Sequence, residues 1–278
     1  MDNKYYCSEF AYLRNKWLKE VSRTFYPSIK VLPRDLHFYV GHSYLICRLL
    51  DTLEDAYDIT VEKKKEALHQ AVLCIKDPVS CPETDSIFSD IAATSEIKPY
   101  EKVILENSFK VFECLDTFPD AVRSHIRDWT IEMADGMKKY AFGSDNSKVQ
   151  LESMEELEEY TYYVAGTVGE LLSRLFTLDH YKVPENRSDV MFANGVAFGK
   201  ALQYVNIIKD SREDFTEGRC FIPADLLKKH KITLEEFFKS DKKAEIKAVY
   251  KELIEKAEDH LQAAIKYIEA VPVRLWRI

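Results

Sequence analysis

The segments SYLICRLLDTLEDAY, residues 43–57, and ALQYVNIIKDSREDF, residues 201–215, carry acidic residues at the same spacing after a strongly apolar run. We call the acids of the first segment the first acid motif (Asp51, Glu54 and Asp55) and those of the second segment the second acid motif (Asp210, Glu213 and Asp214). Positions i, i+3 and i+4 share one face of an α-helix, so each motif directs its carboxylates to one side. Carboxylates on an otherwise apolar helix are costly to bury unless positive charge lies between them. The two motifs therefore predict a Mg²⁺ site shared with diphosphate groups, because Mg²⁺ is commonly bound by carboxylates and substrate phosphates together.

The spacing alone is weak evidence, because acidic residues are common in this chain: 47 of 278. Glu155, Glu158 and Glu159 have the same spacing, and we interpret them as a solvent-exposed face near the start of a helix, where acids are favoured. The other two motifs differ from this third set by their apolar flanks and by their shared DxxED lettering.

The composition is that of an ordinary globular protein, with 46% hydrophobic and 31% charged residues. A net charge of −8 without a long basic stripe argues against nucleic acid as a partner, and we interpret Lys63–Lys65 as a solvent-exposed helix face. The six cysteines have no CxxC spacing and are expected to be small buried apolar residues. There is no signal peptide and no apolar run that could span a bilayer, which favours a cytoplasmic location, with peripheral membrane contact left open.

Helical periodicity runs through nearly the whole chain and predicts an all-α fold. The expected helices cover residues 5–21, 35–57, 61–76, 99–116, 120–142, 153–179, 188–214, 223–230, 233–239 and 243–270. Residues 77–98 are expected to hold a loop and a short helix. No linker requires a second domain, so residues 1–278 are predicted to form one.

Four glycines lie inside two expected helices, where glycine costs about 1 kcal/mol relative to alanine. They are Gly166, Gly169, Gly195 and Gly199. Two explanations stay open: close approach of two helices, or space for a ligand chain with a local break in the first helix.

Four segments in order resemble the squalene/phytoene synthase family, and squalene synthases most. They are SRTF (22–25), YLICRLLDTLED (44–55), YYVAGTVGELLSRLF (162–176) and LQYVNIIKDSREDFTEGRCFIP (202–223). The resemblance implies an all-α isoprenoid-synthase fold around a central cavity lined by the two acid motifs. The chain stops at PVRLWRI, where relatives continue through further helices, so the helices that close the cavity are expected to be missing.

The resemblance also implies an activity: head-to-head condensation of two farnesyl diphosphates through presqualene diphosphate, followed by reduction with NADPH to squalene. Both acid motifs would hold Mg²⁺ on the diphosphates. Arg23, Arg48, Lys209 and Arg219 fall on family positions that contact diphosphate, although an arginine is usual where Lys209 stands. Gln203 and Asn206 would bind diphosphate-bound water or metal. Phe25, Tyr44 and Tyr163 match family positions that stabilise carbocations, with Tyr163 the candidate for proton removal.

Two other functions remain open, one catalytic and one non-catalytic. A phytoene or dehydrosqualene synthase would stop without reduction. A non-catalytic relative would act as an assembly or binding factor, although such relatives usually have eroded acid motifs and both motifs are intact here.

Overall fold

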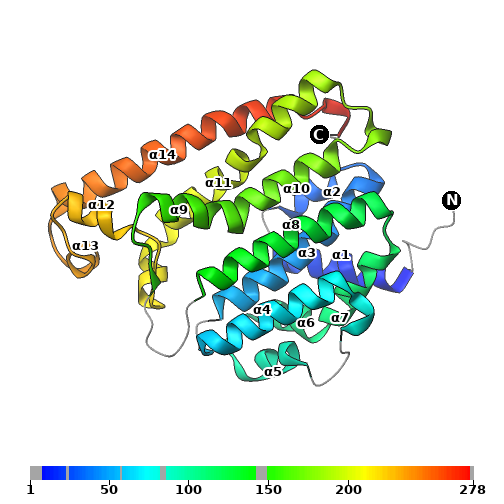
Figure 1. Ribbon diagram of the computed structural model, residues 1–278, viewed down its shortest axis with the longest axis horizontal. Coiled ribbons are helices and arrows are strands. Elements are labelled where there is room, and N and C mark those ends of the chain that lie inside the picture. Colours follow the sequence, from blue (N-terminus) through cyan, green and yellow to red (C-terminus); the bar gives the residue numbers. More distant parts are fainter. Residues whose placement is uncertain (1–7, 23–24, 57, 82–85, 142–148, 276–278) are drawn as a thin grey trace.

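The computed structural model describes residues 8–22, 25–56, 58–81, 86–141 and 149–275, and nearly all of them lie in helices (Figure 1). The α-helices are α1 (Ser8–Ser22), α2 (Tyr26–Lys30), α3 (Arg34–Asp55), α4 (Val61–Lys76), α5 (Ile87–Thr94), α6 (Pro99–Glu106), α7 (Ser108–Glu113), α8 (Asp120–Lys139), α9 (Met154–Thr161), α10 (Thr167–Phe176), α11 (Glu185–Thr216), α12 (Ala224–Lys229), α13 (Leu234–Lys239) and α14 (Lys243–Ala270). Short 3₁₀ turns are η2 (Pro78–Ser80), η3 (Cys114–Thr117), η5 (Asp179–Tyr181) and η6 (Val273–Leu275), and η4 (Tyr162–Gly166) is a π-helical turn. The all-α prediction is confirmed.

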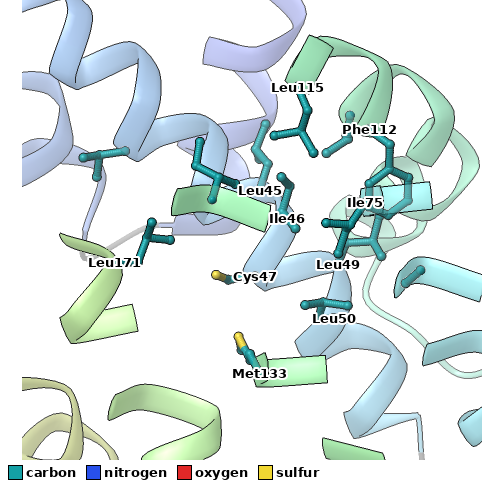
Figure 2. Packing of buried hydrophobic residues seen from close by; sticks show 14 of the residues in the cluster. Leu45, Ile46, Cys47, Leu49, Leu50, Ile75, Phe112, Leu115, Met133 and Leu171 are labelled. Carbon is teal, nitrogen blue, oxygen red and sulfur yellow. The ribbon is translucent and has the colours of Figure 1, made fainter. Parts of the chain in front are cut away.

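Helix α3, which carries the first acid motif, lies at the centre of the larger hydrophobic core. Leu45, Ile46, Leu49 and Leu50 are fully buried. Figure 2 shows these side chains among residues from α4, α7, α8 and α10, including Ile75. Because the rest of α3 is packed in this way, its half-buried and exposed positions from Tyr44 onward lie on one face. The packing therefore decides where Asp51 and Asp55 of the first acid motif point.

Helix α11, which carries the second acid motif, lies between α10 on one side and α14 on the other (Figure 1). Its approach to α10 and to the adjoining turn η4 is closer than side chains allow. A Cβ atom added to Gly169 would lie 1.8 Å from the Gly195 carbonyl oxygen, and one added to Gly199 would lie 1.9 Å from the Ala165 carbonyl oxygen. Close helix approach is thus the reason for these glycines. The local break also exists, because η4 interrupts the rod formed by α9 and α10.

A pair of two-residue strands, absent from the sequence prediction, fixes the segment after α11. Strand β1 (Val149–Gln150) pairs in parallel with β2 (Arg219–Cys220). The main chain continues this contact, since the Leu151 amide donates to the Cys220 carbonyl and the Ala224 amide to the Leu151 carbonyl, at 3.3 and 2.8 Å. Arg219 is therefore held on a pinned backbone beside the end of α11.

Most predicted helices are present, and two have the predicted bounds: α4 and α14. The prediction of one helix over 99–116 is wrong, because the chain breaks at Asn107, whose side chain donates to the Val103 carbonyl at 2.9 Å. A side chain that occupies a backbone acceptor in this way competes with helix continuation. The short helix expected in 77–98 is α5. Within the described residues no helix is long and apolar enough to cross a membrane.

Candidate active site

The first acid motif continues a stripe along one face of α3. Tyr44, Arg48, Asp51 and Asp55 follow one another at intervals of three or four residues. The Tyr44 ring lies 6.0 Å from the Phe25 ring, and its hydroxyl accepts a hydrogen bond of 3.1 Å from Arg48. The structure thus brings Phe25, Tyr44 and Arg48 together, and their shared role in a site remains a prediction.

Arg48 is a half-buried guanidinium whose acidic partners are distant. Its Nη1 atom lies 3.7 Å from Asp51 and 4.0 Å from Glu101, both too long for a good hydrogen bond. Its buried Nε atom has no hydrogen-bond partner among the described residues. Burial raises the pKa of Asp51 to about 7; Arg48 opposes this shift, and the charges of Asp55 and Glu101 add to it. Arg48 can therefore still donate hydrogen bonds to an anion, and the Asp51 carboxylate can still bind a cation.

Glu54, the middle residue of the first acid motif, points into the protein. Its carboxylate accepts a hydrogen bond of 3.2 Å from the Tyr160 hydroxyl of α9, and its backbone carbonyl accepts one from the Lys64 ammonium of α4. Burial raises the pKa of Glu54 and lowers that of Lys64. The interpretation of Lys63–Lys65 as a solvent-exposed face is therefore wrong for Lys64, which is fully buried. The sequence did carry a sign that Lys64 is buried, because Lys64 shares a helix face with the buried Leu68.

The second acid motif is divided between the interior and the surface. Asp214 is buried, Asp210 is half-buried and Glu213 is exposed. Lys209 reaches Asp210 at 3.2 Å, with 64% of its side chain exposed. Of the two amides proposed to bind water or metal, Gln203 is half-buried and lies two turns before Asp210, and Asn206 is exposed and lies one turn before it.

Arg219 joins the two acid motifs. Its guanidinium bonds to Asp55 at the end of α3 and lies 3.1 Å from Asp214 near the end of α11; it also pairs with the neighbouring Glu217. Burial raises the pKa of Asp214 to about 6 against the opposing charge of Arg219, and the charge of Asp55 adds to the rise. Carboxylates 159 positions apart in sequence therefore converge on one cation.

The acid motifs suit Mg²⁺ by the chemistry of their donors, since every proposed ligand is a carboxylate oxygen. The raised pKa values of the half-buried Asp51 and the buried Asp214 indicate carboxylates short of positive charge, which a divalent cation would supply. As they stand, no three acidic, histidine or cysteine side chains of the described residues gather closely enough to hold a metal ion. The guanidinium of Arg219 lies between the motifs instead.

Tyr163 lies in the π-helical turn η4, a kind of turn often found at functional sites. Its ring packs directly on Gly136 of α8, where an added Cβ would lie 2.0 Å from Tyr163 Cγ. In the part of the chain that the structure describes, Tyr163 makes no ring contact with Phe25 or Tyr44. Arg23 lies outside the described residues.

The third acid set is not a solvent-exposed face, contrary to the sequence interpretation. Only Glu155 is exposed. Glu159 accepts hydrogen bonds from Lys139 and Tyr140, and Glu158 lies in a polar cluster between α9, α11 and α14. The donors to Glu158 are Lys200 at 2.6 Å, Tyr204 at 2.7 Å and His260 at 3.0 Å.

Two pockets lie away from the acid motifs. One, of about 290 Å³, is lined by Pro184, Arg187, Pro272 and Val273. The other, of about 410 Å³, lies where the start of α8 meets the end of α10, and includes His125, Arg174 and Phe192. The central cavity at the acid motifs remains a prediction.

Comparison with known proteins adds to this geometry. A family model described as squalene/phytoene synthase matches residues 18–277, nearly the whole chain. The chain belongs to the squalene/phytoene synthase family. Squalene synthase of Rattus norvegicus is 31% identical over 253 residues, which is 91% of this chain and 56% of that protein. Squalene synthase of Schizosaccharomyces pombe is 30% identical over 255 residues, covering 90% of this chain and 52% of that protein.

Solved structures of the squalene/phytoene synthase family share the fold. A ligand complex of TcSQS superposes with a TM-score of 0.78 at 25% identity, over 94% of this chain and 71% of that one. A dehydrosqualene synthase in complex with ligand gives 0.65 at 22% identity, over 97% and 80%. The chain thus spans a little over half the length of the curated relatives that it matches.

Proposed function

We propose that this protein is a prenyltransferase of squalene synthase type, which joins two farnesyl diphosphates head to head to presqualene diphosphate and then forms squalene. The observation that carries this proposal is the contact of Arg219 with both Asp55 and Asp214. Arg219 shows that a positive charge fits between the two acid motifs. A metal ion could take its place beside the carboxylates, and the freed guanidinium could then pair with a diphosphate.

The residues divide into three roles. Both acid motifs would hold Mg²⁺, which when bound neutralises charge on a departing diphosphate, an effect of several kcal/mol. Arg48 and Arg219, with Lys209 and Arg23, would donate hydrogen bonds to diphosphate oxygens. Arg48 suits this role because its own acidic partners are 3.7 and 4.0 Å away. An arginine gives two parallel hydrogen bonds to phosphate where Lys209 gives only a point charge.

The aromatic residues would act on the hydrocarbon part of the substrate. When the first C–O bond breaks, the diphosphate leaves with the electron pair and an allylic cation remains. The faces of Phe25 and Tyr44, whose rings are 6.0 Å apart beside Arg48, can stabilise that cation without reacting with it. Tyr163 would take up or relay the proton lost on closure of the cyclopropane. The final reduction by NADPH is carried over from the family resemblance alone, because no described residue is assigned to a nicotinamide.

The test is product analysis with the purified protein. With farnesyl diphosphate and Mg²⁺ we expect presqualene diphosphate without NADPH and squalene with it. A dehydrogenated C30 product, or a preference for geranylgeranyl diphosphate, would identify a dehydrosqualene or phytoene synthase. No release of diphosphate from either substrate would identify a non-catalytic relative.

Substitutions test the metal assignment separately. Asp51→Asn and Asp214→Asn should each abolish Mg²⁺-dependent release of diphosphate. Glu155→Gln is the matched control, because Glu155 belongs to an acid set of the same spacing and is exposed; its rate should equal that of the wild type. Unchanged release in both aspartate variants would rule out the assignment. We propose a cytoplasmic location and leave peripheral contact with a membrane open.

A further inference from the structure

Lys64 is the one member of a run of three lysines that lies inside the protein. Lys64 has no exposed surface, whereas Lys65 is exposed and Lys63 is half-buried, with its ammonium 2.6 Å from Asp90. Burying an ammonium without compensation is costly, so a buried lysine indicates a specific electrostatic purpose. Helical spacing explains the difference, because Lys64 lies on the face of α4 that packs against α3 and α8, the same face as Leu68.

The Lys64 ammonium bonds to the backbone carbonyl of Glu54, in the last turn of α3. The last four carbonyls of a helix have no partner within the helix, and a positive charge there is favourable to the helix dipole. Lys64 therefore acts as a buried cap on α3, supplied from the next helix. That last turn is the turn that carries the first acid motif.

The same ammonium lies close enough to the acid motif to act on it by charge. It attracts the carboxylates of Glu54 and Asp55, is repelled more weakly by Arg219, and attracts Asp58 least. The Tyr160 hydroxyl donates to the Glu54 carboxylate at 3.2 Å. The end of α3 is thus held by two buried donors, one to the backbone carbonyl of Glu54 and one to its carboxylate.

We propose that Lys64 is a positioning residue of the first acid motif. Its ammonium caps α3 and supplies a fixed positive charge near Glu54 and Asp55, so that the motif's carboxylates stay in place to hold a divalent cation. The proposal rests on the metal role given to this motif under the proposed function. Lys64 itself touches neither metal nor substrate. Residues that hold metal ligands in place typically contribute 10- to 100-fold to metal affinity.

The experiment compares Lys64→Met with Lys65→Met, two uncharged variants one position apart on the same helix. Binding of Mn²⁺ to the whole protein, without substrate, is followed by the loss of the free-ion electron paramagnetic resonance signal. Lys64→Met should weaken Mn²⁺ binding by about 10-fold or more. Lys65→Met should bind Mn²⁺ as the wild type does. The Mg²⁺ concentration that gives half-maximal diphosphate release should rise by the same factor in Lys64→Met.

A purely structural role for Lys64 would give a different result. The melting temperature of Lys64→Met would fall while the folded protein bound Mn²⁺ with unchanged affinity, and that outcome overturns the proposal. If Lys64→Met does not fold, Lys64→Gln replaces it, because its amide can still donate to the Glu54 carbonyl. We expect that variant to lose at least threefold in Mn²⁺ affinity; wild-type affinity in Lys64→Gln would also overturn the proposal.

Failure of the proposed function is distinguishable from failure of this inference. If the wild type binds no Mn²⁺, the metal role of the acid motifs is wrong, and the role of Lys64 falls with it. If the wild type and Lys65→Met bind Mn²⁺ and Lys64→Met binds it equally well, only the inference about Lys64 is wrong.

Discussion

Replacement of Gly169 by alanine tests the closest helix contact in the protein. The new Cβ would lie 1.8 Å from the Gly195 carbonyl oxygen of α11. Bringing that distance to an ordinary contact of 3.4 Å moves the two backbones apart by about 1.6 Å along that line. Overpacking of this kind costs about 1–3 kcal/mol, and we expect the upper end because backbone lies on both sides. Alanine returns about 1 kcal/mol through its higher helix propensity.

The net destabilisation is therefore about 2 kcal/mol, which for a chain of this size lowers the melting temperature by about 3–4 °C. Differential scanning calorimetry measures this directly, and urea unfolding checks the free energy. The control is Gly41→Ala in α3, where the new Cβ would meet only side-chain ends, that of Leu18 at 3.0 Å and that of Ile29 at an ordinary contact of 3.6 Å. That variant should melt within a degree or two of the wild type or above it. A Gly169→Ala protein as stable as the wild type would refute the close approach of α10 and α11.

Three further predictions concern single polar groups. Burial raises the pKa of Asp51 from 3.8 to about 7, so between these pH values the folded state binds a proton that the unfolded state does not, and stability falls as pH rises. In urea unfolding without metal, Asp51→Asn should therefore be more stable than the wild type at pH 8 and should lose that advantage near pH 4. Burial tends to raise the pKa of Glu158, but hydrogen bonds from His260 and two other side chains hold that pKa well below its usual range. The stability that Glu158 contributes is therefore present above about pH 4.3, its usual pKa, and is lost as pH falls. The destabilisation caused by Glu158→Gln should be large at pH 7 and should shrink when unfolding is measured in acid. Tyr160→Phe removes the 3.2 Å hydrogen bond to Glu54 and should cost about 1 kcal/mol of unfolding free energy in urea, with more if the buried carboxylate stays ionised.

The helices could be predicted from the sequence because their signals are local. The bounds of α4 and α14 follow from apolar periodicity and flanking breakers alone. The break at Asn107 depends on one side chain that bonds to the preceding turn, and periodicity does not detect this. The β1–β2 pair could not be predicted because it is a long-range contact between residues 149 and 219. Neither strand is long enough to show alternation of apolar and polar residues.

The acid motifs could be located from their spacing, whereas Arg48 and Arg219 were named only through the family resemblance and their contacts could not be predicted. The cation that joins Asp55 to Asp214 comes from strand β2, and spacing within a helix carries no information about it. The same limit explains the error at Glu158, whose donors Lys200 and His260 lie 42 and 102 positions away. Lys64 is different, since its place on the buried face of α4 was readable from the periodicity of that helix.

The three acid sets have the same spacing, and what separates them is the positive charge that the fold supplies. Glu158 is fully compensated by Lys200 and its hydrogen-bonding neighbours, which hold its pKa down. Asp51 and Asp214 remain short of positive charge after Arg48 and Arg219 are counted, and burial holds their pKa values at about 7 and 6. A carboxylate that the fold satisfies has little to gain from a metal ion, whereas one that the fold buries and leaves short of charge gains most. Such perturbed groups gather at functional sites. This difference supports the proposal that the first and second acid motifs bind a cation, whereas Glu158 of the third set joins α9 to α11 and α14.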